Sequence, residues 1–98
     1  MNYTSELKPK AIKDLRSIPL KERERILARV DLLEDGLQGD VIKLTNHTPE
    51  YRMRSGKYRV LFEIEEHKIV IYRVLHRKEA YLRVFIHKSL KKMEKKNL

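Results

Sequence analysis

The chain has 98 residues, a length that suits one small domain with a single hydrophobic core, and we expect residues 1–98 to form it. It contains no cysteine, which excludes disulfides and thiolate zinc sites and gives no support for an oxidising compartment. The N-terminal residues lack a signal-peptide core, and no run approaches the roughly 18 apolar residues of a membrane span. We therefore expect a soluble, cytoplasmic protein with no membrane partner.

The net charge of +9 is unevenly distributed along the chain. Residues 1–50 carry nine basic and nine acidic groups, whereas residues 51–98 carry fourteen basic and five acidic groups. A basic excess confined to one half is typical of a domain that binds a polyanion, because neutralised phosphates release counterions. The plainer alternative is a solvated basic surface.

The first half of the chain has the apolar spacing of helices. Residues 2–6 could form a short first strand. A helix is expected from Pro9, with apolar residues at helical spacing up to Ile18. The segment Leu20–Leu37 repeats this pattern more strongly, and glycines at 36 and 39 close it. We expect a helical hairpin with one apolar side facing a sheet.

The second half has the alternation of strands, which we expect at residues 41–44, 51–54, 58–65 and 69–75. Turns are expected at residues 55–57 and 66–67, and a final helix from Glu79, with residues 91–98 as a frayed tail. The predicted fold class is α+β. It is an N-terminal helical hairpin packed on a small, mainly antiparallel, three- to four-stranded sheet, followed by a C-terminal helix.

Basic side chains gather on the expected strands. Arg52 and Arg54 are two residues apart and so point to the same face, and Arg59 lies just beyond the turn. Arg77 follows the next strand, and Tyr81 lies about one helical turn later. Antiparallel pairing would bring these ends to one concavity, which Lys57, His76 and Lys78 adjoin as further candidates for binding an anion.

Such a cluster predicts a phosphate ligand. Like charges placed opposite one another on a sheet are destabilising, so crowded arginines indicate that an anion normally lies among them. The planar guanidinium can donate two parallel hydrogen bonds to phosphate and does not lose its proton. Neighbouring cations should lower the pKa of the Tyr81 phenol, since they favour the phenolate, and so make it a possible proton acceptor.

Two motifs, YRMRSGKYRVLF and RVLHRKEAY, resemble the RelE branch of the RelE/ParE toxin superfamily. The resemblance implies a ribosome-dependent messenger-RNA endonuclease that cuts in the decoding site, uses no metal or other cofactor, and is neutralised by a cognate antitoxin. It matches Arg59 and Arg77 to arginines of the catalytic face and Tyr81 to the tyrosine thought to act as base. Arg52 and Arg54 fall where RelE proteins often carry two lysines.

This last departure affects the mechanism, because arginine cannot act as a base. Arg52 and Arg54 can bind phosphate, and proton transfer falls to Tyr81, with His76 as an open alternative. We expect the ribose 2′-hydroxyl to attack the adjacent phosphorus, with Tyr81 taking its proton and Arg77 assisting the leaving oxygen.

Other functions and partners stay open at this point. The rivals are a ParE-like gyrase inhibitor and a catalytically silent binding module or corepressor that acts with its antitoxin. The expected partners are an antitoxin, the ribosome and messenger RNA, with DNA reached only through the antitoxin. We expect the antitoxin to dock on the apolar side of the helical hairpin or to displace a helix at Leu82–Leu90.

Several residues have structural explanations. Tyr58 and Tyr72 are expected to fill the core or its rim, and Tyr51 could stack on a base or pack on the hairpin. Arg73 is expected to pair with Glu63 or Glu65 across the sheet rather than with RNA. The four histidines share no spacing of the kind that metal sites have.

Overall fold

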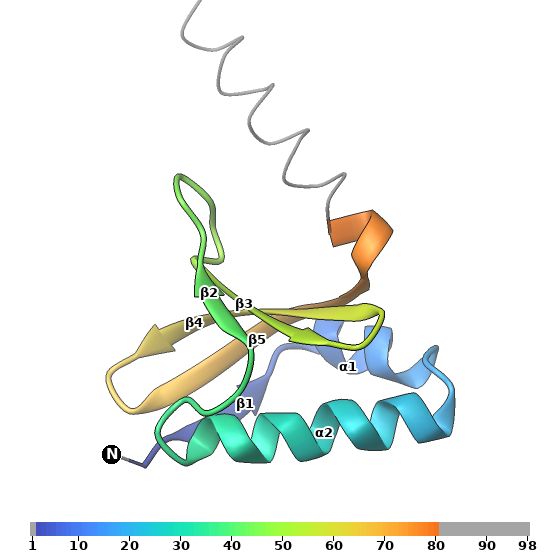
Figure 1. Cartoon of the computed structure of the whole chain (residues 1–98), viewed down its shortest axis with the longest axis horizontal. Coiled ribbons are helices and arrows are strands. Elements are labelled where there is room, and N and C mark those ends of the chain that lie inside the picture. The colour runs from blue at the N-terminus through green and yellow to red at the C-terminus, as the bar shows by residue number, and fades with distance from the viewer. Residues whose placement is uncertain (1, 81–98) are drawn as a thin grey trace, which may run out of the picture.

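The computed structural model describes residues 2–80 (Figure 1). It contains a five-stranded sheet with the strand order β1-β5-β4-β3-β2 and two helices on one side of it. The elements are β1 (Thr4–Leu7), α1 (Pro9–Arg16), α2 (Leu20–Glu34), β2 (Val41–Lys43), β3 (Tyr51–Ser55), β4 (Tyr58–Glu65) and β5 (Lys68–His76). Residues 77–80 are helical. The expected continuation of this helix and the frayed tail at 91–98 lie outside the described residues.

The α+β class is confirmed, but the expected sheet of three to four strands was too small. Strand β1 adds a fifth strand, which pairs in parallel with β5 so that Thr4 lies opposite Lys68 and Leu7 opposite Ile71. The other three pairings are antiparallel. The sheet is therefore mixed. Backbone hydrogen bonds keep the four-residue strand β1 at the edge of the sheet. The N–H of Thr4 donates to the carbonyl of His67, and the N–H of Lys8 donates to the carbonyl of Ile71.

The hydrophobic core lies between the helices and one face of the sheet. The apolar side chains of α1 and α2 pack against the strand side chains that point to the same face of the sheet. The fully buried side chains include Ile26 and Leu33 of α2 with Met53, Val60 and Phe62 of the sheet. Helix α1 packs on β5, whereas α2 contacts β1 and β3. Each helix of the expected hairpin thus rests mainly on the sheet. The sheet covers the buried apolar residues of these helices, while Ile12, Leu27 and Leu32 stay partly exposed on them, and the docking of an antitoxin on the helical hairpin stays a prediction.

Asp14 fastens α1 to β5. Its carboxylate accepts hydrogen bonds from Nε and Nη2 of Arg73 at 2.8 and 3.0 Å and from the backbone N–H of Val74 at 2.9 Å. Strand β1 ends opposite Ile71, so it offers no backbone carbonyl to the N–H of Val74. The carboxylate of Asp14 accepts this hydrogen bond instead. The expected pairing of Arg73 with Glu63 or Glu65 was therefore wrong. The partner comes from a helix rather than from the neighbouring strand.

The face of the sheet turned away from the helices has a small apolar cluster of its own. It consists of Leu61, Leu75 and Ala80, all nearly inaccessible to solvent. A β-bulge lies between Leu61 and Phe62, where Leu61 is opposite Arg73 but Phe62 is opposite Ile71. The extra residue changes the alternation along β5, so apolar residues face both sides of this strand.

Among residues 2–80, no helix is long and apolar enough to cross a membrane.

Candidate functional site

The arginines of the β3–β4 hairpin share the face of the sheet that lies away from the helices. Arg54 and Arg59 are directly opposite each other, and Arg59 is also opposite Leu75 of the outer apolar cluster. Arg77 joins them because its backbone N–H donates to the carbonyl of Lys57 at 2.7 Å. This bond ties the first residue after β5 to the β3–β4 turn. The structure thus brings together Arg54, Arg59 and Arg77.

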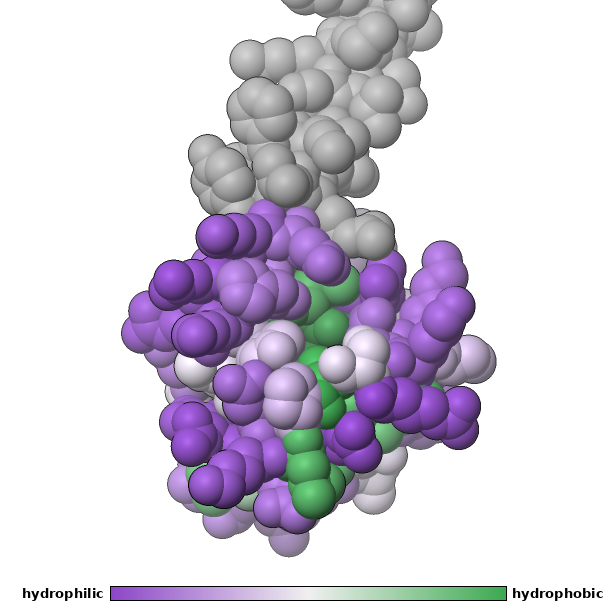
Figure 2. Space-filling model, turned by 90° about the vertical axis from the view of Figure 1, so that its right-hand side faces the viewer, coloured by the Kyte–Doolittle hydropathy of each residue, from purple (hydrophilic) through white to green (hydrophobic). Residues whose placement is uncertain are grey.

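These side chains line a cavity of about 400 Å³. Its lining consists of Arg29, Asp40, Arg54, Gly56, Arg59 and Arg77. Arg29 comes from α2 and Asp40 immediately precedes β2, and neither was expected from the sequence. The cavity therefore lies where α2, the start of β2 and the β3–β4 turn meet. The face that carries this turn is mostly hydrophilic and has only a narrow strip of apolar residues (Figure 2).

Two of the guanidiniums are held in place by acceptors. Nε of Arg54 donates to Oδ2 of Asp40 at 2.6 Å. Nη1 of Arg59 donates to the carbonyls of Gly56 and Tyr58, each at 2.9 Å. Among residues 2–80, the Nε and Nη2 atoms of Arg59 have no protein acceptor. They form the edge of the guanidinium that can donate two parallel hydrogen bonds to a phosphate.

The electrostatics of the cavity favour an anion. Burial lowers the pKa of Arg59, and the charges of Arg52, Arg54 and Arg77 lower it further, while Asp40 acts in the opposite direction. Each of the three arginines disfavours the charge of Arg59. A bound phosphate would replace this repulsion by attraction. Within residues 2–80, the lining holds four guanidiniums and one carboxylate, so the ligand that suits it is anionic.

The other predicted site residues lie around the cavity. Arg52 faces the same side as Arg54 but does not line the cavity, and one pleat of β3 separates the two by about 7 Å. Lys57 lies in the exposed turn. The ring of His76 meets Tyr58 edge-on, with centroids 5.8 Å apart, and its Nδ1 accepts the N–H of Lys78 at 3.2 Å. Tyr81 lies outside the described residues.

Two tyrosines have structural roles. Burial raises the pKa of Tyr58, and a hydrogen bond with Glu22 raises it further. This residue packs against the core, as predicted. Tyr51, which the sequence left undecided, also packs against the core. It stacks on Phe62 with ring centroids 5.5 Å apart and an angle of 17° between the planes.

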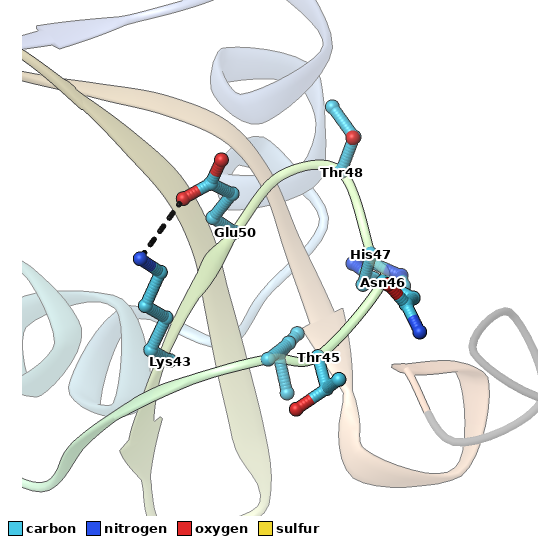
Figure 3. A pocket seen from close by; sticks show the side chains of 7 residues that line it. Lys43, Thr45, Asn46, His47, Thr48 and Glu50 are labelled. Atoms are coloured by element: carbon cyan, nitrogen blue, oxygen red, sulfur yellow. Dashed lines mark ion pairs between the residues drawn. The ribbon is translucent and has the colours of Figure 1, made fainter.

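A second cavity, of about 480 Å³, lies in the β2–β3 loop. Figure 3 shows Lys43 and Glu50 pointing toward each other, and their charged atoms are 3.7 Å apart. His47 is buried, and its Nδ1 is 2.8 Å from the carbonyl oxygen of Pro49. This loop lies at the start of β3, whereas the arginine-lined cavity lies beside the turn at the end of β3. Within the described part of the chain, no three His, Asp or Glu side chains form a group that could hold a metal ion.

The sequence and fold resemble those of known toxins. The family model of the ParE toxin of the type II toxin–antitoxin system parDE matches residues 6–81. The chain belongs to the RelE/ParE toxin superfamily. It is 33% identical over 75 residues to toxin RelE3 of Methanocaldococcus jannaschii, an alignment that covers 71% of this chain and 85% of that toxin. The resemblance found in the two motifs is therefore confirmed.

Solved structures agree with this assignment. The RelB–RelE antitoxin–toxin complex from Methanococcus jannaschii matches with 30% identity and a TM-score of 0.65, covering 76% of this chain and 93% of the other. The archaeal RelE–RelB complex from Pyrococcus horikoshii matches with 30% identity and a TM-score of 0.64, covering 79% and 97%. The chain is thus a toxin of the type II toxin–antitoxin RelE family.

Proposed function

We propose that this RelE-family toxin is a ribosome-dependent endoribonuclease that cleaves messenger RNA in the decoding site and so stops translation. The observation that carries the proposal is the convergence of Arg54, Arg59 and Arg77 on one cavity. Positive groups fixed in advance around a phosphate stabilise the charge that develops in the transition state. The hydrogen bonds from Arg59 to the turn and from Arg54 to Asp40 fix two of these groups.

In the proposed reaction the substrate supplies the nucleophile. The ribose 2′-oxygen forms a bond to the adjacent phosphorus, and the bond from phosphorus to the 5′-oxygen of the next nucleotide breaks. The products are a 2′,3′-cyclic phosphate and a free 5′-hydroxyl. Tyr81 takes the proton of the 2′-hydroxyl. Arg77 donates a hydrogen bond that stabilises the negative charge on the leaving 5′-oxygen, and this oxygen takes its proton from water. Arg59 holds the oxygens of the scissile phosphate.

The reaction is proposed to be metal-independent because the arginines supply the charge that a metal ion would otherwise bring. Arg52, Arg54 and Lys57 bind the RNA backbone in this proposal, with His76 and Lys78 at its margin. Tyr81 is proposed as the base because positions 52 and 54 hold arginines, which keep their protons. His76 is the weaker candidate, since its ring lies against Tyr58 rather than in the arginine-lined cavity.

The proposed partner is a small cognate antitoxin. The two related complexes from archaea each contain RelB beside RelE, which supports a RelB-like partner for this chain. The expected displacement of a helix at Leu82–Leu90 concerns residues outside the described part of the chain, and it stays a prediction. DNA association would come only through the antitoxin.

Induction of the toxin in growing cells tests the proposal. We expect translation to stop and messenger RNA to be cut at fixed positions within codons. A gyrase-inhibiting toxin would instead leave messenger RNA intact and induce the DNA-damage response, and the match to the ParE family model makes this the second candidate. Growth without either effect would indicate a silent binding module. Either of these two results would overturn the nuclease proposal.

A further inference from the structure

Arg29 is a cavity residue that does not belong to the sheet. It lies in α2, one residue before buried Val30, and is half-buried, whereas Arg25, one helical turn earlier, is exposed. Of these two arginines only Arg29 lines the cavity with Arg54, Arg59 and Arg77. The cationic lining therefore continues from the open face of the sheet to a helix that covers the opposite face.

The charges of the cavity are not balanced within it. Among the described residues that line the cavity, Asp40 is the only one with a carboxylate, and Arg54 already binds it. Nη1 of Arg59 is held by two backbone carbonyls. Within residues 2–80, Arg29 forms no ion pair with an acidic side chain. The cavity thus keeps a net positive charge of three, one of which comes from α2.

The size of the cavity exceeds what one phosphate group fills. A volume of about 400 Å³ falls within the range of pockets that hold whole small molecules, about 300–1,000 Å³. Gly56 lines the cavity without contributing a side chain, and its φ of 58° belongs to the conformation that favours glycine at a tight turn. There is room for the scissile phosphate and for part of the neighbouring nucleotide.

We propose that Arg29 forms a second phosphate-binding subsite, next to the one formed by Arg54, Arg59 and Arg77. The subsite takes a neighbouring backbone phosphate of the single-stranded RNA, so the strand continues from the sheet over the β3–β4 turn toward α2. Arg52 extends the positive surface in a different direction, along the open face of β3. The subsite rests on the proposed function, because it names where that RNA goes.

Binding of a non-cleavable RNA by the purified full chain tests the subsite. A short fluorescent oligoribonucleotide with 2′-O-methyl riboses cannot be cut, since the attacking oxygen is blocked. Its affinity is measured by anisotropy over a range of salt concentrations for the wild type, Arg29→Ala, Arg29→Lys and Arg25→Ala. Arg25→Ala is the matched control, because it removes the same charge from the same helix at an exposed position outside the cavity.

The loss of one phosphate contact reduces the slope of log affinity against log salt by about 0.7 for a single strand. We expect this reduction for Arg29→Ala, an unchanged slope for Arg25→Ala, and a slope near that of the wild type for Arg29→Lys, which keeps the charge. Equal slopes for Arg29→Ala and Arg25→Ala would overturn the subsite. The circular dichroism spectrum of each variant verifies its fold. If the alanine variant does not fold, Arg29→Gln replaces it, because glutamine also removes the charge but keeps more of the side chain, and the same reduction in slope is expected.

The two proposals fail separately. If the wild type binds the blocked oligonucleotide with the expected differences among variants but does not cut messenger RNA on ribosomes, the subsite stands and the nuclease proposal is wrong. If the wild type cuts messenger RNA and Arg29→Ala binds with an unchanged slope, the nuclease proposal stands and the subsite is wrong.

Discussion

Arg54 and Asp40 are joined through both their side chains and their backbones. Nε of Arg54 donates to Oδ2 of Asp40 at 2.6 Å, and the backbone N–H of Arg54 donates to the carbonyl of Asp40 at 2.9 Å. Asp40 immediately precedes β2, so the pairing of β2 with β3 places its carboxylate beside the arginines. This carboxylate both orients Arg54 and competes with phosphate for it.

Replacing Asp40 tests this competition. Asp40→Asn removes the one negative charge among the described residues of the cavity lining. We expect the blocked oligonucleotide to bind about threefold to tenfold more tightly at low salt, because a partly exposed charge interaction at short range is worth about 1 kcal/mol. Anisotropy measures the change. The control is Glu24→Gln, which removes the same charge at an exposed position of α2 outside the cavity. Weaker binding by Asp40→Asn would mean that orienting Arg54 outweighs the competition.

Asp14 is expected to be important for stability. Its side chain is 15% exposed and accepts three hydrogen bonds, two of them from Arg73. Asp14→Ala leaves a partly buried guanidinium and a backbone N–H without their acceptor, which should cost about 3 kcal/mol of unfolding free energy. Urea denaturation measures the loss. The exposed residue Asp31 provides the control, since Asp31→Ala should cost far less, and similar values for both variants would refute the role of Asp14.

The lowered pKa of Glu6 should make the free energy of unfolding fall slightly in acid. A hydrogen bond from Lys8 and the charges of Lys8 and Lys68 lower the pKa of Glu6 below its usual value of 4.5. Because the pKa is lower in the folded state, the contribution of Glu6 to stability is present above pH 4.5 and is lost as the pH falls through the folded-state value. We expect Glu6→Gln to flatten the acid side of the stability profile, measured by urea denaturation between about pH 3 and pH 7. An unchanged profile would argue against the effect.

Proton transfer by Tyr81 can be tested separately from binding. Tyr81→Phe removes the proposed base, and we expect cleavage to fall by a factor of about 10²–10⁴, the usual size of general acid–base catalysis. Binding of the cognate antitoxin should stay intact, and copurification of the two proteins measures it. Cleavage equal to that of the wild type would exclude the tyrosine as the base.

The elements with strong apolar periods were predictable from the sequence. Both helices and strands β3, β4 and β5 bury side chains at the spacing that identifies them. Strand β1 was harder to predict because four residues are too few to show a clear apolar alternation. Its parallel pairing also depends on the unpaired edge of β5, which is far away in the sequence. The pairing of Asp14 with Arg73 joins residues far apart in the chain, so no local pattern could indicate it.

The arginines of the site were predictable for a similar reason. Arg54 and Arg59 are brought together by a hairpin, which is a local structure. Arg29 and Asp40 reach the same cavity only through the packing of α2 and the pairing of β2. A signal for Arg29 was available, since it precedes Val30 in the buried stripe of the helix and therefore lies at the edge of the covered face.

The central claim is that this toxin cleaves messenger RNA through the ribose 2′-hydroxyl. The most direct measurement uses purified toxin and programmed ribosomes with two messages, which differ only by a single 2′-deoxy residue at the cleavage position. We predict that the all-ribose message is cut to a 2′,3′-cyclic phosphate and that the deoxy message stays intact. Equal cleavage of both messages, or cleavage of neither, would contradict the account.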